Sequence, residues 1–287
     1  MSDSIPRTEL CRLEIDGPVA RLNLTRTHVH NALNVQLISE ITDVLEWAAV
    51  RSVGSTGELH GSDGSQNLRV LVISSEGRHF CAGADINMMR EGGKKSAEDN
   101  RSDAELLDCL FHGLWSHPCF TIASVHGVAL GGGAGLVACC DHAIATKETR
   151  IALSEAKLGI LPAVIGPYVY RRVGSAQFRR LATLAGTFET EEALTIGMID
   201  QIADNAEEAS RLVEETIAAL LTTGPVAVME AKSLTDSFDR WTGTDEELRE
   251  WVLDKTSEMR ASTEGQEGLA AFLEGRKPAW SPEDQEG

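Results

Sequence analysis

The sequence contains few aromatic residues, no paired cysteine motif and no long hydrophobic run. Phe, Trp and Tyr make up 5% of the 287 residues, so aliphatic side chains and alanine must fill the interior. The six cysteines form no CxxC pair and no Cys/His spacing typical of zinc, which favours buried thiols in a reducing compartment. No apolar run approaches the roughly 18 residues that a membrane span needs, so we expect no membrane partner.

Basic residues are also scarce. The formal net charge is −18, with 26 Lys and Arg against 44 Asp and Glu. Nucleic acids and anionic membranes reward a basic surface, so we expect neither as a partner. The N-terminal residues include neither the apolar segment of an export signal nor an Arg-rich amphipathic stretch. Together with the unpaired cysteines, this predicts a cytoplasmic protein.

Alternating and continuous apolar runs predict an α/β core. Residues 10–26 hold two alternating segments joined at Asp16–Gly17, the pattern of a β-hairpin. Residues 68–77 and 119–130 are continuous apolar runs of strand length, as expected for strands buried on both faces. Helical patterns separate such runs, so strands and helices alternate as in βαβ units.

Helical spacing also covers residues 31–50, whereas residues 50–67 are rich in Gly, Ser and Asp and are predicted to form a surface loop. From about Ser175 onward the pattern is helical. We therefore divide the chain into an α/β core over residues 1–200 and a helical C-terminal region over residues 201–287.

Three consecutive glycines, Gly131 to Gly133, stand between the strand-like run 119–130 and a second apolar run, Ala134 to Cys140. Glycine loses the most backbone freedom on folding, so three glycines in a row are costly. We therefore expect that the absence of side chains is needed at this position. Free N–H groups where a strand runs into a helix can bind an anion or stabilise an oxyanion. The spacing matches neither the dinucleotide pattern nor the phosphate loop. Close packing of helix on strand is the alternative.

Two further stretches favour chemistry over packing. HFCAGAD, at residues 79–85, also follows a buried strand and opens a helix, so two turns can aim two N–H donors at one thioester carbonyl. Glu155 lies between apolar segments, where burial raises a carboxyl pKa towards the working pH. The alternative for Glu155 is a cap on the helix that Ser154 starts.

Four blocks in this order resemble the crotonase (enoyl-CoA hydratase/isomerase) superfamily. They are FCAGAD, HGVALGGGAGL with CCDHAIA, LSEAKLGILP and EGQEGLAAFLEGRKPAW, and the resemblance runs from about residue 10 to 280. It implies an α/β crotonase (ClpP-like) spiral of ββα repeats, with a helical C-terminal region involved in trimerisation and closure of the CoA site. It also implies a homotrimer or a hexamer of two trimers. The substrate would be an acyl-CoA thioester, with no cofactor other than the CoA of the substrate and no metal.

The resemblance assigns roles position by position. The N–H groups of Ala84 and Gly132 match the oxyanion hole, and Glu155 matches a catalytic glutamate. His28 stands where many members have a lysine, and the lysine expected after Phe272 falls on Gly275, so Arg276 or Lys277 would contact the CoA phosphates. The positions that match substrate- and CoA-binding residues are His28, Val29, Ala82, Asp85, Ile86, Gly131, Gly135, Phe272 and Lys277.

One departure from the family pattern bears on the reaction. The well-studied hydratases hold water between two glutamates, and the place of the second one is Gly135 here. Glu155 would then act twice, first as base towards water and then as proton donor to the α-carbon. A single glutamate is also what the 3,2-enoyl-CoA isomerases use, so isomerisation is the alternative. An acyl-CoA-binding protein without hydratase activity is a third interpretation.

The glycine block and the segment ILPAVIGPYV most resemble bacterial 3-methylglutaconyl-CoA hydratases of leucine degradation and isohexenylglutaconyl-CoA hydratases. We therefore expect an enoyl-CoA hydratase-type lyase that acts on the 2,3 double bond of a branched glutaconyl-CoA. Arg90, Lys94 and Lys95 are candidates for binding its distal carboxylate, although such a charge run is usually a solvated loop. Tyr168 is another candidate or a core tyrosine, and His126 is expected to be structural. The charge of −18 and the lack of a lysine-rich helix weigh against the RNA-binding role of a eukaryotic relative.

Overall fold

The N-terminal hairpin begins a six-stranded sheet. The structure, a computed structural model, describes residues 4–282. As predicted, β1 (Cys11–Asp16) and β2 (Val19–Leu24) pair antiparallel, and Gly17 supplies the turn with a φ of 52°. The remaining strands are parallel and give the order β1-β2-β3-β4-β6-β9. They are β3 (Val70–Ser75), β4 (Phe120–Val125), β6 (His142–Thr146) and β9 (Gln201–Ala203).

A second, smaller sheet branches from the first at Gly127. The apolar run 119–130, expected to be one strand, divides there into β4 and β5 (Val128–Leu130), which belong to different sheets. Gly127 has a φ of 65°, and a Cβ on it would stand 2.2 Å from the Arg78 carbonyl oxygen, so only glycine fits. β5 pairs parallel with β7 (Arg150–Ala152), which pairs antiparallel with β8 (Phe188–Glu189).

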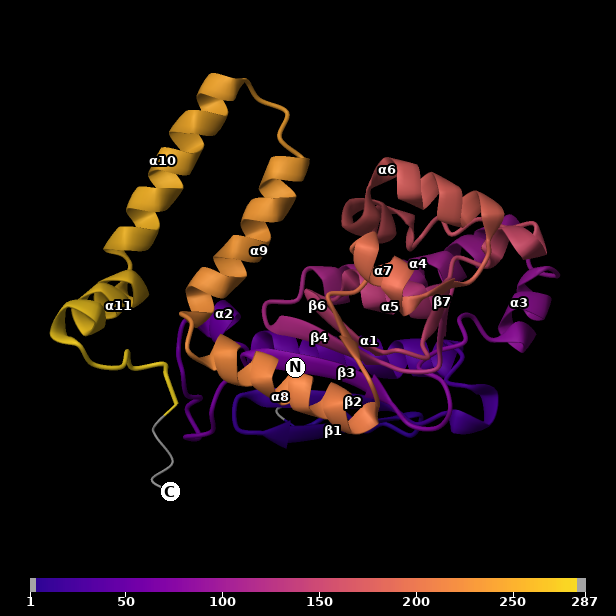
Figure 1. Cartoon of the computed structure of the whole chain (residues 1–287), viewed down its shortest axis with the longest axis horizontal. Helices are drawn as coiled ribbons and strands as arrows, with labels where there is room; N and C mark the ends of the chain where they lie inside the picture. Colours follow the sequence, from indigo (N-terminus) through magenta and orange to yellow (C-terminus); the bar gives the residue numbers. More distant parts are fainter. Residues whose placement is uncertain (1–3, 283–287) are drawn as a thin grey trace.

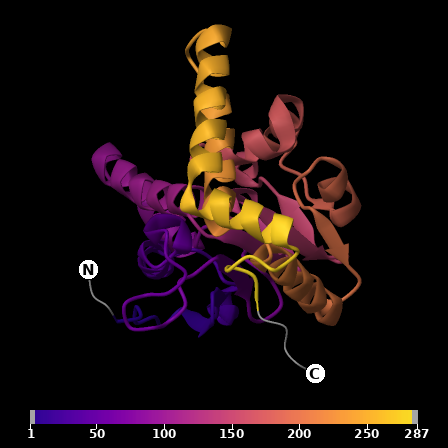
Figure 2. The same ribbon diagram turned by 90° about the vertical axis from the view of Figure 1, so that its left-hand side faces the viewer.

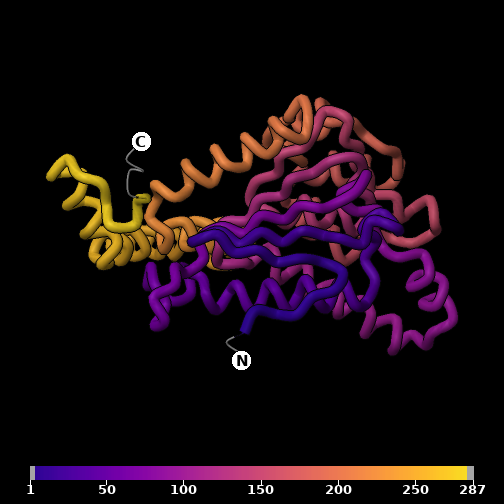
Figure 3. The backbone as a smooth tube through the Cα atoms, turned by 90° about the horizontal axis from the view of Figure 1, so that it is seen from below, coloured from indigo at the N-terminus to yellow at the C-terminus, as the bar shows by residue number. Residues whose placement is uncertain are grey.

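Helices cover both faces of the large sheet. One face packs against α8 through Val213 and Ile217, while the larger core on the other face includes α1, α4 and α5. Figure 3 shows α8 and α1 on opposite sides of the strands. The helices are α1 (Val35–Val50), α2 (Val53–Thr56), α3 (Ile86–Gly92), α4 (Ala97–Trp115), α5 (Gly132–Cys139), α6 (Gly166–Leu184), α7 (Thr190–Thr195), α8 (Ala206–Leu221), α9 (Pro225–Asp239), α10 (Asp245–Ala261) and α11 (Thr263–Glu274), with short 3-10 helices η1 (Thr27–Val29) and η2 (Glu155–Leu158).

The last three helices form an arm that projects from the sheets (Figures 1 and 2). The strand β9 still belongs to the large sheet, so the sheet extends three residues beyond the expected boundary at residue 200. The base of the arm is anchored by Lys232 of α9, whose ammonium donates to the Asp141 carboxylate at 2.7 Å. Arg69 adds a buried anchor, because its guanidinium donates to the carbonyls of Leu221 and Trp280.

Among the helices of residues 4–282, no single one is long and apolar enough to cross a membrane. Only α8 and α9 taken together, bent by 103°, have the length and composition of a span.

Candidate active site

Two backbone amides without acceptors lie in neighbouring segments where the small sheet ends. Neither the N–H of Ala84 nor that of Gly132 donates a hydrogen bond within the described part of the chain. The two segments lie together, because a Cβ built on Gly83 would stand 3.8 Å from the Gly132 nitrogen. Two free N–H groups in adjacent segments can serve as the donors of an oxyanion hole.

Strand pairing explains why the Ala84 amide is free. Residues 81–85 extend the small sheet through bridges from Cys81 to Ala129 and from Ala84 to Leu33. Leu33 donates to the Gly83 carbonyl at 2.7 Å and accepts from the Asp85 amide at 2.9 Å. Successive residues of a strand direct their N–H groups to opposite edges, so the Ala84 amide points away from Leu33.

The Gly132 amide is free because the neighbouring strand ends. β5 stops at Leu130, and Gly131, with a φ of 50°, turns the chain into α5. The first N–H groups of a helix have no partner within the helix and lie at its positive end. The glycines are required sterically, since a Cβ on Gly133 would stand 2.4 Å from the Cys81 carbonyl oxygen. The two interpretations of the triple glycine, close packing and free amides, are therefore both correct at this turn.

The carboxylate of Glu155 lies beside this hole. Glu155 is the first residue of η2, and its Oε1 would be 2.9 Å from a Cβ on Gly131. Its Oε2 is buried and has no hydrogen-bond partner in the structure. Burial raises the pKa of the Glu155 carboxyl, and donation from its own backbone N–H offsets this only in part. An unpartnered carboxylate oxygen with a raised pKa is suited to accepting a proton from a ligand.

Apolar side chains occupy the space above Gly135. A Cβ there would stand 2.4 Å from Ile165 Cγ2 and 2.9 Å from Phe111 Cε1. Both side chains are buried, with 4% and 1% of their surface exposed. Gly135 itself is buried, so the structure gives it a packing contact rather than an open face towards a ligand. A second carboxylate at this position is excluded by the packing around it.

The predicted CoA-contacting turns lie next to each other. The Ala82 amide donates to the His30 carbonyl at 3.0 Å, which joins the turn with His28 and Val29 to the turn with Ala82. His28 is exposed, and Ile86 has 75% of its surface exposed. The two turns are therefore adjacent, and their contact with CoA stays a prediction.

Asp85 has a structural task in addition to any ligand contact. Its Oδ2 accepts from Arg26 Nη1 at 2.6 Å, and its Oδ1 accepts from the Asn87 amide and caps α3. Burial opposes ionisation of Asp85, but the hydrogen bonds from Arg26 and Asn87 outweigh it and lower the pKa of this carboxyl. The side chain thus clamps the two turns, and a contact with CoA would have to come from its backbone.

Phe272 and Lys277 do not join the other predicted residues within one chain. Phe272 lies on α11, which Figures 1 and 3 place at the opposite end of the molecule from α3 and the Ala82–Ile86 turn. Phe272 has 83% of its surface exposed. Arg276, the alternative to Lys277 for a phosphate contact, is held by both carboxylate oxygens of Glu267.

The remaining candidates are mostly structural. Arg90, within α3, donates to Asn87, and Lys95 forms an ion pair with Asp103, so both exposed cations already have partners. Tyr168 is 5% exposed and packs on Trp115 with ring centroids 5.6 Å apart, and burial raises its pKa to about 12. His126 Nε2 lies 3.0 Å from the Gly77 carbonyl oxygen, which agrees with a structural histidine.

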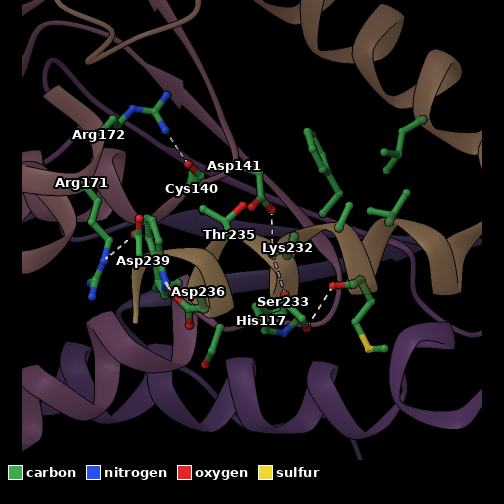
Figure 4. A pocket seen from close by; sticks show the side chains of 17 residues that line it. His117, Cys140, Asp141, Arg171, Arg172, Lys232, Ser233, Thr235, Asp236 and Asp239 are labelled. Atoms are coloured by element: carbon green, nitrogen blue, oxygen red, sulfur yellow. Dashed lines mark hydrogen bonds and ion pairs between the residues drawn. The ribbon is translucent and has the colours of Figure 1, made fainter. Parts of the chain in front are cut away.

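A cavity of about 610 Å³ lies away from this centre, between α6 and the base of the arm (Figure 4). Its cations are occupied: Lys232 binds Asp141 and two backbone carbonyls, and Arg171 pairs with Asp239. The third, Arg172, binds the Cys140 carbonyl. Within residues 4–282, no group of three or more His, Cys, Asp and Glu side chains could hold a metal ion.

Two sheets with a helical arm, and two free amides facing one glutamate, define an α/β protein of the crotonase fold. The family model described as enoyl-CoA hydratase/isomerase matches residues 14–283, and the chain belongs to this family. The predicted fold class is thereby confirmed.

Relatives align over nearly the whole chain. An enoyl-CoA hydratase structure from Shewanella pealeana is 34% identical with a TM-score of 0.86, over 96% of this chain and 97% of the other. Pseudomonas aeruginosa AtuE is also 34% identical, with a TM-score of 0.85, over 96% of this chain and all of its own. YhaR of Bacillus subtilis is 30% identical over 276 residues, 94% of this chain and 98% of its own length.

Proposed function

We propose that this protein is an enoyl-CoA hydratase that uses Glu155 as its single acid and base. The observation that carries the proposal is the buried, unpartnered Oε2 of Glu155 beside the free amides of Ala84 and Gly132. A thioester carbonyl that accepts from both amides gains stabilisation as its oxygen becomes an enolate.

Hydration then follows in two proton transfers. Glu155 takes a proton from water while the hydroxide oxygen bonds to C3. The electron pair of the C2–C3 double bond forms the C1–C2 double bond of the enolate, and the carbonyl π pair moves to the thioester oxygen. The amides of Ala84 and Gly132 stabilise that enolate. Protonated Glu155 next donates its proton to C2, which completes the addition of one water molecule and restores the carboxylate.

For the substrate we propose 3-methylglutaconyl-CoA or a related branched glutaconyl-CoA, as in leucine degradation. The support is the resemblance of the glycine block and of residues 153–169 to those hydratases. Of the candidate cations for the distal carboxylate, Arg90 and Lys95 have partners, whereas the Lys94 ammonium has none within residues 4–282. We therefore assign Lys94 to this contact.

Isomerisation of 3-enoyl to 2-enoyl thioesters is the second candidate. The apolar packing over Gly135 favours it, because Ile165 and Phe111 remove the site of a second carboxylate. One glutamate can take a proton from C2 and return it to C4 with no water consumed. A protein that only binds acyl-CoA is disfavoured by a Glu155 carboxylate left free beside the oxyanion amides.

We also propose a cytoplasmic homotrimer, or a hexamer of two trimers, in which α11 reaches the CoA site of a neighbouring copy. The exposed Phe272 and Leu273, at 83% and 82%, and the distance of α11 from the Ala82 turn support this arrangement.

Ultraviolet absorbance of the conjugated enoyl thioester tests the reaction. Purified protein is offered 3-methylglutaconyl-CoA, crotonyl-CoA and 3-hexenoyl-CoA in turn. Loss of absorbance with the first, reduced about 10²- to 10⁴-fold by Glu155→Gln, is the expected result. A gain with 3-hexenoyl-CoA alone would identify an isomerase instead. Tight binding with no absorbance change for any thioester would contradict both.

A further inference from the structure

The packing over Gly135 bears on the reaction, provided that Glu155 and the two free amides act on an enoyl-CoA thioester as proposed. Gly131 and Gly135 are one helical turn apart, since the Gly135 amide donates to the Gly131 carbonyl at 3.0 Å. Residues four apart lie on one face of a helix. That face carries the Glu155 carboxylate at Gly131 and the side chains of Ile165 and Phe111 at Gly135.

Phe111 joins this apolar packing to the oxyanion hole. Its Cζ would be 3.7 Å from a Cβ on Gly132, and its Cε1 would be 2.9 Å from a Cβ on Gly135. The apolar pair therefore lies one helical turn from the Glu155 carboxylate, and Phe111 also lies next to Gly132, whose amide would bind the thioester oxygen. Ile165 and Phe111 have almost no exposed surface, so water has no polar contact on their side.

We propose that Ile165, backed by Phe111, keeps water from the Gly135 side of the reaction centre and thereby sets the ratio of hydration to isomerisation. After Glu155 has taken a proton from C2 of a 3-enoyl thioester, the C–H electron pair forms the dienolate. The same proton can then bond to C4, which gives the 2-enoyl thioester. It can instead exchange with water, or water can add across the double bond. The apolar pair favours the first outcome.

The test compares Ile165→Ala with two matched controls. Ile165→Val retains the Cγ2 that contacts Gly135. Val169→Ala truncates a fully buried residue one turn later, on α6, and Val169 is not among the atoms nearest to a Cβ on Gly135. Each protein turns over 3-hexenoyl-CoA and 3-methylglutaconyl-CoA in D₂O. Mass spectrometry gives the deuterium content of the products, and absorbance gives the ratio of hydration to isomerisation.

For Ile165→Ala we expect the deuterium content at C4 of the 2-enoyl product and the hydration ratio to rise about tenfold, a change of ~1.4 kcal/mol in relative barriers. Both controls should keep the wild-type values. Equal shifts in Ile165→Ala and Val169→Ala, or no shift in an active and folded Ile165→Ala protein, would overturn the inference and leave the proposed function intact. A wild type inactive on both thioesters would instead refute the proposed function.

Discussion

The protonated form of Glu155 favours the stability of the fold, whereas the proposed activity needs the ionised form. Its carboxyl is partly buried and its Oε2 lacks a partner, so the folded state binds a proton more tightly than the unfolded chain does. Stability contributed by this group is therefore greatest at low pH and is lost as the pH rises from the unfolded pKa to the raised folded pKa. Catalysis needs the ionised form, which dominates only above the raised value.

This conflict predicts the pH dependence of the enzyme. On the acidic side, the kcat/KM profile should have its midpoint at a pH above 4.5, the ordinary pKa of glutamate. The reason is that the essential base of the free enzyme, Glu155, has a raised pKa. At neutral pH, Glu155→Gln should have a higher melting temperature than the wild type while losing turnover. Calorimetry from pH 4 to 8 should show this difference shrinking towards acid. A melting temperature lowered by the substitution at pH 8 would contradict the assignment.

The glycines of the oxyanion turn differ in what a side chain would meet. Gly133→Ala places a Cβ 2.4 Å from the Cys81 carbonyl oxygen, and backbone cannot move aside cheaply. We expect a loss of about 1–3 kcal/mol in the free energy of unfolding and a loss of activity, because the Gly132 amide must shift. Gly186→Ala is the matched control, since nothing lies within 4 Å of its new Cβ. Urea denaturation of both proteins distinguishes packing from a general effect of glycine replacement.

At the scale of elements, the turns that carry the amides are held by a buried clamp. Arg26 Nη1 donates to Asp85 and to the Ala32 carbonyl, and the two charged side chains are only 13% and 6% exposed. The clamp joins residues 26–34 to residues 82–85 and so fixes the Ala84 amide against Leu33. The sequence contains both residues, but no local pattern indicates that they pair, so this contact could not be predicted from it.

Breaking the clamp should affect stability and catalysis together. Arg26→Gln leaves the Asp85 carboxylate buried without its cation, which typically costs about 3–5 kcal/mol. The pair Arg26→Gln with Asp85→Asn should recover part of that loss, because no unpaired charge remains. We expect kcat to fall more than the affinity for CoA, since the displaced group is an oxyanion donor. Denaturation and steady-state kinetics of the three variants measure both effects, and additive losses in the double variant would argue against the clamp.

The elements predicted from sequence succeed or fail for identifiable reasons. The hairpin at Gly17, helix α1 and the strand-to-helix turn at Gly131 follow from local patterns and are confirmed. The division of residues 119–130 between two sheets was missed, because it depends on how closely Gly127 approaches the Arg78 carbonyl. The apolar packing on Gly135 was missed for the same kind of reason, since Ile165 reaches it from a distant part of the chain. The roles of the CoA-contacting residues stay predictions.

At the scale of the whole molecule, a single chain holds only part of the proposed CoA site. The turns with His28 and Ala82 and the proposed acid and base Glu155 belong to the core, while Phe272 belongs to the arm and Lys277 follows its last helix. Figure 1 places α11 and α3 at opposite ends, so the arm can complete a site only on another copy of the chain. The charge of −18 makes each copy repel the next, so assembly should strengthen with ionic strength.

Mixing two defective proteins tests this division of labour. A Glu155→Gln chain lacks the acid and base but has an intact arm, whereas a Phe272→Ala chain has an intact core and a weakened arm. If the arm acts on a neighbour, mixed oligomers contain sites with Glu155 from one chain and Phe272 from the other. Activity at low substrate concentration should then exceed that of either protein alone after exchange of subunits at low salt. Activity equal to the average of the two parents would show that α11 serves its own chain or none.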